Sequence, residues 1–347
     1  MGKIKMNKKG IFFTFIAITM MIVFIILFTQ QPDLSLTRNS NGVLVRISSI
    51  DDYIDDLEKS YLKTALQTSS YKAIFSLIEY EKGGAYLADF NESFFEVASN
   101  GTIEDPYGSG IHVLIDTITG KKIMENSTME NWTKSISDTA SSTFNINTTI
   151  KINNITALQS NPWEIDITLD ANITVASNVA KWKKRSMIQT SIPIEGLSDP
   201  YFLVNTNGAY DNKIKKSSVI FNQWNISKAR EHLRNGTYVH WQNSQAPSFI
   251  MRFTNSINPS ECCGIESLVN PNKLAIPDNI ESYTDYLFWT SAYSSRCIEL
   301  YNITYPGGNP PYTGGLWDEF QYFKMDFDSL VRYNISQDSQ NDALRTC

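Results

Sequence analysis

The side chains best suited to chemistry are three histidines and two aspartates. His232 and His240 lie eight positions apart, and His112 is far upstream of both. Asp326 and Asp328 have the spacing of two carboxylates that could bind calcium or hydrolyse a glycoside, but a calcium loop normally supplies more oxygen ligands and a glycine. We therefore expect no metal and no cofactor. A hydrolase that uses Asp326, Asp328 or a histidine is the alternative.

The short motifs that mark common enzyme classes are absent from the chain. It has no GxSxG elbow, phosphate-binding P-loop, HExxH helix or GxGxxG turn. We predict that the protein is not an enzyme.

Charge is divided unevenly along the 347 residues. The net charge is −6, but the first 28 residues carry four lysines and no acid, which leaves −10 for the remainder. Nucleic-acid binding requires clustered lysine and arginine to contact phosphates. The acidic remainder therefore argues against nucleic acid as a partner.

An apolar segment near the N-terminus has the length of a membrane span. Ile11–Phe28 contains eighteen residues without a charge, and as a helix it would be about 27 Å long, close to the hydrocarbon core of a bilayer. The preceding lysines place the N-terminus in the cytoplasm and the following residues outside the cell. A cleaved signal peptide is the alternative, but the apolar run is long for one and no small-residue cleavage site follows it. We predict a single-pass protein with a basic leader over 1–10 and a membrane helix over 11–29.

Asn-x-Ser/Thr sequons also indicate an extracellular body. The chain has eleven of them, all beyond residue 90, where chance would supply about five. Along their predicted strands, Asn147 and Asn172 occupy the positions that alternate with the apolar residues (the opposite parity), so both side chains should point outward. The glycosylation candidates are Asn91, Asn100, Asn126, Asn131, Asn147, Asn154, Asn172, Asn225, Asn235, Asn302 and Asn334.

The four cysteines are Cys262, Cys263, Cys297 and Cys347. An even number in one region of an exported chain fits two disulfides, for which three connectivities exist. A bond between adjacent cysteines is strained, so we expect Cys262 and Cys263 to pair with Cys297 and Cys347. Zinc is the rival interpretation, but the histidines show no ligand spacing.

The first elements after the apolar segment are predicted to be helices. Ser48 or Ser49 can cap a long helix that continues to Lys82, with apolar residues at three- and four-residue spacing, and Gly83–Gly84 should end it. Shorter helices are expected at 86–98 and 128–140.

An unbroken alternation follows, in which every second residue from Trp163 to Val175 is apolar. Period two is typical of a strand with one buried face. Similar patterns over 144–152 and 188–194, joined by short connections, predict an antiparallel meander of three strands.

Residues 201–347 are less regular. Helices are expected near 225–234 and 279–292, and strands near 248–254 and 320–327. The predicted fold class is α+β, with a connector over 30–48, a helical and antiparallel-sheet ectodomain over 49–200, and a disulfide-containing lobe over 201–347. Gly/Pro-rich loops in that lobe carry Tyr312 and Trp317, side chains suited to contact with surface glycans or another protein.

The start of the chain resembles the class III signal of prepilins. Lys8–Lys9–Gly10 stands directly before the apolar stretch that begins at Ile11. The resemblance implies that a prepilin peptidase cuts between Gly10 and Ile11 and that the apolar helix is kept as a filament core. Together with the sequons and the helix-then-meander order, the signal is similar to that of archaeal type IV pilin-like surface proteins.

These features lead to one expected function and two alternatives. We expect a non-enzymatic, membrane-anchored cell-surface protein, either a pilin-like subunit or an adhesin, that presents an extracellular interaction domain. Its partners would be the lipid bilayer, a prepilin peptidase, filament or envelope subunits, and surface glycans. A membrane-anchored extracytoplasmic hydrolase and the ectodomain of an envelope complex are the alternatives.

Overall fold

The computed structural model describes residues 40–104, 111–115, 120–178, 180–242, 245–274, 282–289, 299–303, 323–335 and 340–345. Contacts divide the chain into two compact units, Met1–Asp51 and Asp52–Cys347. The predicted leader and membrane helix lie outside the described residues, and within those residues no helix is both long and apolar enough to cross a bilayer. The expected domain boundary at residue 200 stays a prediction.

Helical structure continues without a break from Ser40 to Glu81. It comprises helix α2 (Ser40–Asp56), the π-helical turn η1 (Leu57–Leu62) and helix α3 (Lys63–Glu81). The predicted long helix is present, but the expected cap at Ser48 or Ser49 is wrong. The Ser49 hydroxyl instead donates to the carbonyl oxygen of Val45, one turn earlier, a bond that serine makes inside helices. The predicted stop is confirmed, because Gly84 follows with a φ of +86°.

The next two helices are each bounded by a recognisable cap. Helix α4 (Phe90–Asn100) begins at Asp89, whose side chain accepts from the backbone nitrogen of Glu92 at 2.8 Å. Helix α5 (Met129–Phe144) begins at Thr128, whose hydroxyl accepts from the backbone nitrogen of Asn131 at 3.2 Å. Between them, strands β1 (Thr102–Glu104) and β2 (Ile111–Val113) pair antiparallel. Both predicted helices are confirmed, although α5 takes in Phe144, which the alternation had assigned to a strand.

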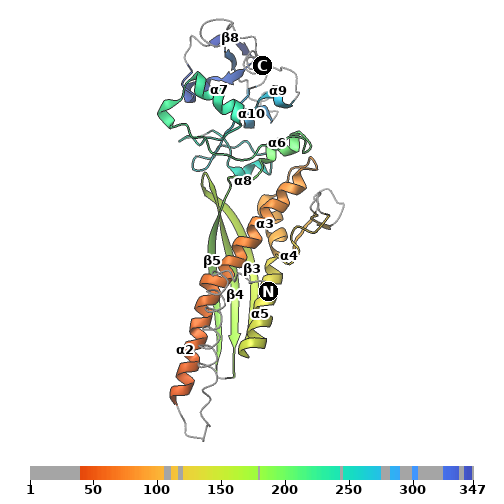
Figure 1. Ribbon diagram of the computed structural model, residues 1–347, viewed down its shortest axis with the longest axis vertical. Helices are drawn as coiled ribbons and strands as arrows, with labels where there is room; N and C mark the ends of the chain where they lie inside the picture. The colour runs from red at the N-terminus through yellow and green to blue at the C-terminus, as the bar shows by residue number, and fades with distance from the viewer. Residues whose placement is uncertain are drawn as a thin grey trace, which may run out of the picture. The chain divides into compact units, whose positions relative to one another are not determined.

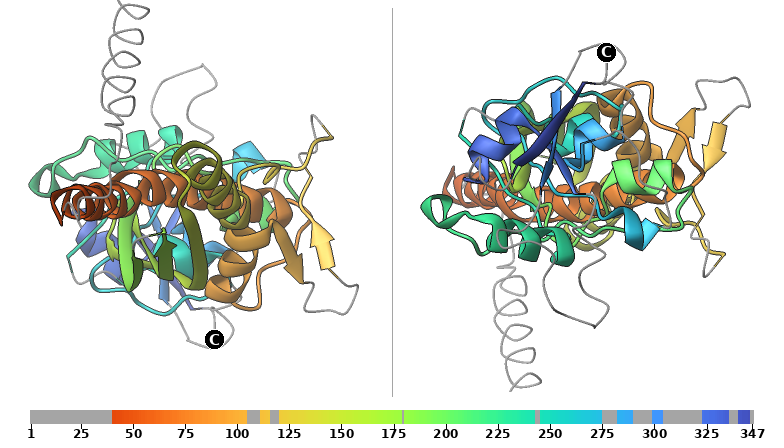
Figure 2. Two further views of the ribbon diagram at one scale, coloured as in Figure 1. Left: turned by 90° about the horizontal axis from the view of Figure 1, so that it is seen from below. Right: turned by 90° about the horizontal axis from the view of Figure 1, so that it is seen from above.

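Strands β3 (Asn147–Asn161), β4 (Glu164–Ala176) and β5 (Lys181–Pro193) form the predicted antiparallel meander in that order. The alternating apolar side chains of β4 are buried on one face, and helices α3, α4 and α5 contact the sheet (Figures 1 and 2). Burying one such side chain contributes about 1.5–3 kcal/mol relative to leaving it in water. The fold is therefore α+β with an antiparallel sheet, as the periodicities predict.

Residues beyond 200 form short elements. Strand pairing within them follows the antiparallel order β7-β6-β8. The described elements are α6 (Pro200–Asn205), the 3₁₀ turn η2 (Phe221–Gln223), α7 (Ile226–Asn235), α8 (Phe249–Arg252), α9 (Pro271–Leu274), α10 (Asp285–Phe288), β6 (Glu299–Ile303), β7 (Lys324–Asp326), α12 (Phe327–Arg332) and β8 (Gln340–Arg345).

The sequence-based assignments for this part are mixed. The helix near 225–234 is confirmed as α7, the strand near 320–327 includes β7, and α10 falls within the expected helix at 279–292. The strand expected near 248–254 is wrong, because α8 occupies that segment. Its helical turn places Phe249, Arg252 and Phe253 in the interior, all 0% exposed, and leaves the two residues between them partly exposed.

Candidate functional site

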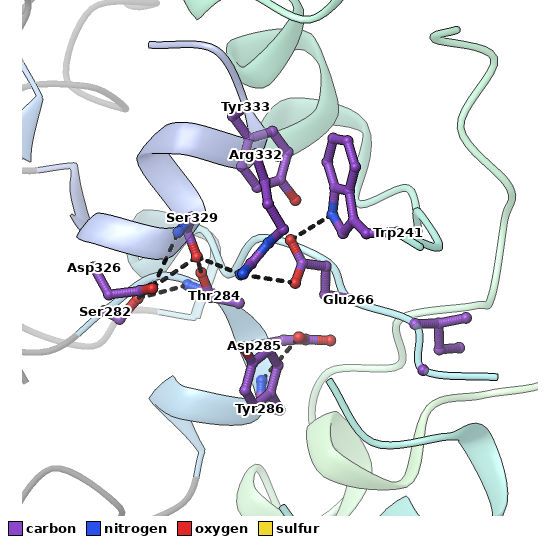
Figure 3. A network of polar contacts seen from close by, with 12 residues as sticks. Trp241, Glu266, Ser282, Thr284, Asp285, Tyr286, Asp326, Ser329, Arg332 and Tyr333 are labelled. Atoms are coloured by element: carbon purple, nitrogen blue, oxygen red, sulfur yellow. Dashed lines mark hydrogen bonds and ion pairs between the residues drawn. The ribbon is translucent and has the colours of Figure 1, made fainter. Parts of the chain in front are cut away.

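Asp326 caps a helix inside a buried network of hydrogen bonds (Figure 3). Its carboxylate accepts from the backbone nitrogen of Ser329 at 3.1 Å, from the Ser329 hydroxyl at 2.7 Å and from the Ser282 hydroxyl at 3.3 Å. Asp328 is exposed in the first turn of α12, where a negative charge is favourable. The two aspartates therefore occupy different environments, and Asp326 uses both of its oxygens to hold the helix in place.

The same network continues through Arg332 to Glu266 and Trp241 (Figure 3). Arg332 Nη2 donates to the Ser329 hydroxyl at 2.8 Å and to Glu266 Oε2 at 3.2 Å, and Trp241 Nε1 donates to Glu266 Oε1 at 2.8 Å. Burial acts to lower the pKa of Arg332, but the Glu266 carboxylate, together with Tyr286, Asp326 and Tyr333, raises that pKa above its usual range. The network joins α12 to two distant segments through hydrogen bonds between buried polar groups.

A second buried network surrounds Arg252 and was not predicted from the sequence. Arg252 Nη1 lies 2.6 Å from Asp199 Oδ2 and 2.7 Å from Asp285 Oδ2, and all three side chains are 0% exposed. Arg252 Nη2 donates to the carbonyl oxygen of Ile265, and the Tyr238 hydroxyl donates to Asp199 at 2.7 Å. The Arg252 guanidinium therefore bonds to side chains as many as 53 positions away in the sequence.

Burial acts on the pKa values of two carboxyl groups around Arg252. Burial raises the pKa of Asp285, although Arg252 acts to lower it. Burial likewise raises the pKa of Glu81 well above its usual range, and the negative charge of Asp199 acts in the same direction. No arginine or lysine forms an ion pair with Glu81 in the described part of the chain. Burial without a cationic partner therefore favours the neutral form of the Glu81 carboxyl.

The two histidines proposed as a base and its orienting partner have other partners. His232 Nδ1 lies 2.6 Å from the Thr237 hydroxyl, and Nε2 lies 3.2 Å from the Tyr333 hydroxyl. Burial lowers the pKa of His232 to about 3, so the ring is neutral at physiological pH. His240 Nδ1 lies 2.7 Å from the Gly264 carbonyl oxygen. Neither ring is bonded to the other, and the His112 side chain lies outside the described residues.

Potential metal ligands do not gather in the described segments. Across them, no group of three or more histidine, cysteine, aspartate or glutamate side chains could hold an ion.

Sequon asparagines are concentrated at the surface. All eleven lie in the described segments; ten are exposed, Asn302 is partly exposed, and none is buried. Asn147 and Asn172 are both exposed on the meander, which confirms the outward orientation predicted from parity. Exposure is a requirement for glycosylation. Glycan occupancy at these asparagines stays a prediction.

Asn302 should have the lowest glycan occupancy of the eleven sites. It lies within β6, which pairs with strands on both sides, whereas Asn147 is exposed at the start of β3. Peptide mass spectrometry after enzymatic deglycosylation in heavy-oxygen water would measure occupancy at each asparagine. A fully occupied Asn302 beside an empty Asn147 would contradict this expectation.

The expected cysteine pairing is wrong for the two cysteines that the structure describes. Cys262 and Cys263 are bonded to each other within the turn from Ser260 to Gly264, in which Ser260 O accepts from the backbone nitrogens of Cys263 and Gly264. Both sulfur atoms lie against the carbonyl oxygen of Gln159 near the end of β3, at 3.6 and 3.0 Å. Cys297 and Cys347 lie outside the described residues.

Four further residues of interest also fall outside the described part of the chain. They are the proposed processing residues Gly10 and Ile11 and the proposed contact residues Tyr312 and Trp317. Their roles stay predictions.

Comparison with known proteins gives no relative from which to infer a function. No family model, no curated protein and no solved structure matches the chain. Its function must therefore be argued from its own residues and their arrangement.

Proposed function

We propose that the chain is a non-enzymatic, membrane-anchored cell-surface protein, a pilin-like subunit or adhesin that presents an extracellular interaction domain. The observation that carries this proposal is the helical run from Ser40 to Glu81, whose α3 portion packs on an antiparallel meander. This run lies shortly downstream of the apolar segment Ile11–Phe28 and the prepilin-like signal. A helix that leads from an anchor into a sheet is the order expected of a pilin-like subunit.

Two properties of the body support display outside the cell. The sequon asparagines reach the surface on helices, strands and turns, as glycosylation would require. Two of the titratable side chains that suggested a hydrolase have structural roles: Asp326 caps α12, and His232 is enclosed between two hydroxyls. The interior of the C-terminal part is thus built for stability, which suits a displayed domain.

The anchor and its processing can be tested on the full-length chain incubated with membranes that contain a prepilin peptidase. Mass spectrometry should find Ile11 as the mature N-terminus, and Gly10→Val should abolish cleavage because the residue before the scissile bond must be small. Gly2→Val is the matched control and should be cleaved like the wild type. A wild-type chain that still begins at Met1 would overturn prepilin processing.

Co-purification from native membranes then separates a filament subunit from a component of an envelope complex. Self-association into filaments supports the first assignment. Stoichiometric recovery of different envelope proteins, without self-association, favours the second.

A further inference from the structure

An aromatic cavity lies where the hairpin end of the meander meets the segment that precedes α7. Its volume is about 240 Å³, which is below the roughly 300–1,000 Å³ typical of sites for drug-sized ligands and leaves room for a single ring. Trp163 lies at the β3–β4 hairpin, and Phe221, in η2, is 70% exposed at the rim. Trp241 and Tyr238 line the buried side of the cavity.

Aromatic contacts give this cavity rigid walls. The Phe221 ring meets the Trp241 ring edge to face, with 5.6 Å between centroids, and Trp224 contacts Trp241 at 5.4 Å. Trp224 is 2% exposed, and its indole N–H has no hydrogen-bond partner in the described structure.

One positive charge accompanies the aromatic walls. Lys216 Nζ lies 5.2 Å from the centroid of the Trp163 ring. No ion pair joins Lys216 to a carboxylate within the described segments, and Glu195 instead accepts from the backbone nitrogen of Lys216 at 3.2 Å. The ammonium group is therefore available to an anion, and it would repel a cationic ligand that the aromatic rings might otherwise attract.

Two further polar groups complete the lining. His240 Nδ1 lies 2.7 Å from the Gly264 carbonyl oxygen, so this nitrogen carries a proton and donates it to that oxygen. The Ser217 oxygen accepts from the backbone nitrogen of Val219 at 3.2 Å, which leaves its hydrogen free to be donated. Donors and acceptors placed beside aromatic faces match a ligand whose ring is apolar on its C–H face and rimmed by hydroxyls.

We propose that this cavity binds one sugar ring that bears a carboxylate, such as the terminal uronic acid of a glycan. The ring packs its C–H face on Phe221 and Trp163, and its carboxylate pairs with Lys216. The inference deepens the proposed function by naming a ligand class for a surface protein, and it does not depend on cleavage at Gly10.

The test uses matched pairs of methyl glycosides with the detergent-solubilised full-length chain. Methyl glucuronide, galacturonide and mannuronide are each compared with the neutral glycoside of the same stereochemistry, by saturation-transfer NMR and titration. At least one uronide should bind, and its affinity should exceed that of its neutral counterpart by about fivefold or more, equivalent to about 1 kcal/mol. Absence of binding by all three uronides, or equal affinity within each pair, would overturn the proposal.

Three variants assign the binding to this cavity. Phe221→Ala should weaken uronide binding by about tenfold, as truncation of a well-placed aromatic anchor commonly does. Ile220→Ala is the matched control, since Ile220 is 60% exposed next to Phe221 and does not line the cavity. Lys216→Met should remove the preference for the uronide over the neutral sugar. Unchanged binding in Phe221→Ala would place the ligand elsewhere and end the assignment, whereas the processing experiment at Gly10 would be unaffected.

Discussion

Replacement of Arg252 by methionine should lower the free energy of unfolding by about 3–5 kcal/mol, because it leaves buried carboxyl groups without their cation. Asp199 and Asp285 are both 0% exposed and both rely on Arg252 Nη1, at 2.6 and 2.7 Å. A loss of that size is a large part of the about 5–15 kcal/mol that stabilises a typical domain. Urea unfolding of the detergent-solubilised full-length chain, followed by tryptophan fluorescence, would measure it.

Arg185 provides a matched control for this substitution. Arg185 Nη2 lies 2.6 Å from Asp170 Oδ2, the same kind of contact, but the arginine side chain is 70% exposed on β5. Water solvates both groups when the pair is broken, so Arg185→Met should change stability far less than Arg252→Met. Similar losses in the two variants would mean that burial of the carboxylates is not the cause.

A combined variant distinguishes the unpaired charges from lost packing around the arginine. Arg252→Met together with Asp199→Asn and Asp285→Asn removes both buried carboxylates and should recover a substantial part of the lost stability, since replacing a whole buried charge network costs less than breaking it. If Arg252→Met does not fold, recovery of a cooperative transition in the combined variant still tests the argument. A combined variant that unfolds at the same urea concentration as Arg252→Met, or at a lower one, would contradict this argument.

The sequence predicts elements whose signals are local. The alternation from Trp163 to Val175 depends only on the period of a strand, and β4 lies where that period places it. The caps Asp89 and Thr128 act within three residues of themselves, so α4 and α5 could be expected near their observed positions. Short connections then leave an antiparallel meander as the simple arrangement.

Interactions between distant residues explain the failures. The segment 248–254 is rich in apolar side chains and could form either a strand or a helical turn. The bonds of Arg252 to Asp199 and Asp285 favour the helical turn. An arginine between Met251 and Phe253 is itself a signal, because burying it requires acidic partners. The sequence does not show which acids these are, since Asp199 is 53 residues away.

The same contrast between local signals and interactions of distant residues applies to the candidate site. Outward orientation of Asn147 and Asn172 could be predicted because side-chain direction on a strand alternates. The aromatic cavity could not, because its walls come from the β3–β4 hairpin, from η2 and from the segment around Trp241. Only the folded chain brings Trp163 and Lys216 together. The sequence does not predict the bond between Cys262 and Cys263, because the turn from Ser260 to Gly264 that holds the two cysteines is visible only in the folded chain.

Acid should destabilise the protein through His232, with the loss beginning near pH 6.5. Burial lowers the pKa of His232 to about 3 in the folded chain, whereas the unfolded chain has an ordinary imidazole. Below about pH 6.5 the unfolded state therefore binds a proton that the folded state does not. This histidine's contribution to stability is fully present above that pH and is lost as the pH falls toward 3, by about 4–5 kcal/mol in total.

His232→Gln should remove this acid-dependent loss, because glutamine can still bond to the hydroxyls of Thr237 and Tyr333 but does not titrate. The raised pKa values of Glu81 and Asp285 act in the opposite sense, since the contribution of these carboxyl groups to stability falls as the pH rises. The quantity to compare is therefore the difference in free energy of unfolding between the variant and the wild type at each pH.

The variant should be less stable than the wild type at pH 7.5, where it has lost the packing of the imidazole against Trp224. This difference in stability should shrink as the pH is lowered. His240→Gln is the control for replacing a histidine by glutamine at a partly exposed position. Parallel profiles for His232→Gln and the wild type between pH 6.5 and 4 would show that protonation of this buried ring does not limit acid stability.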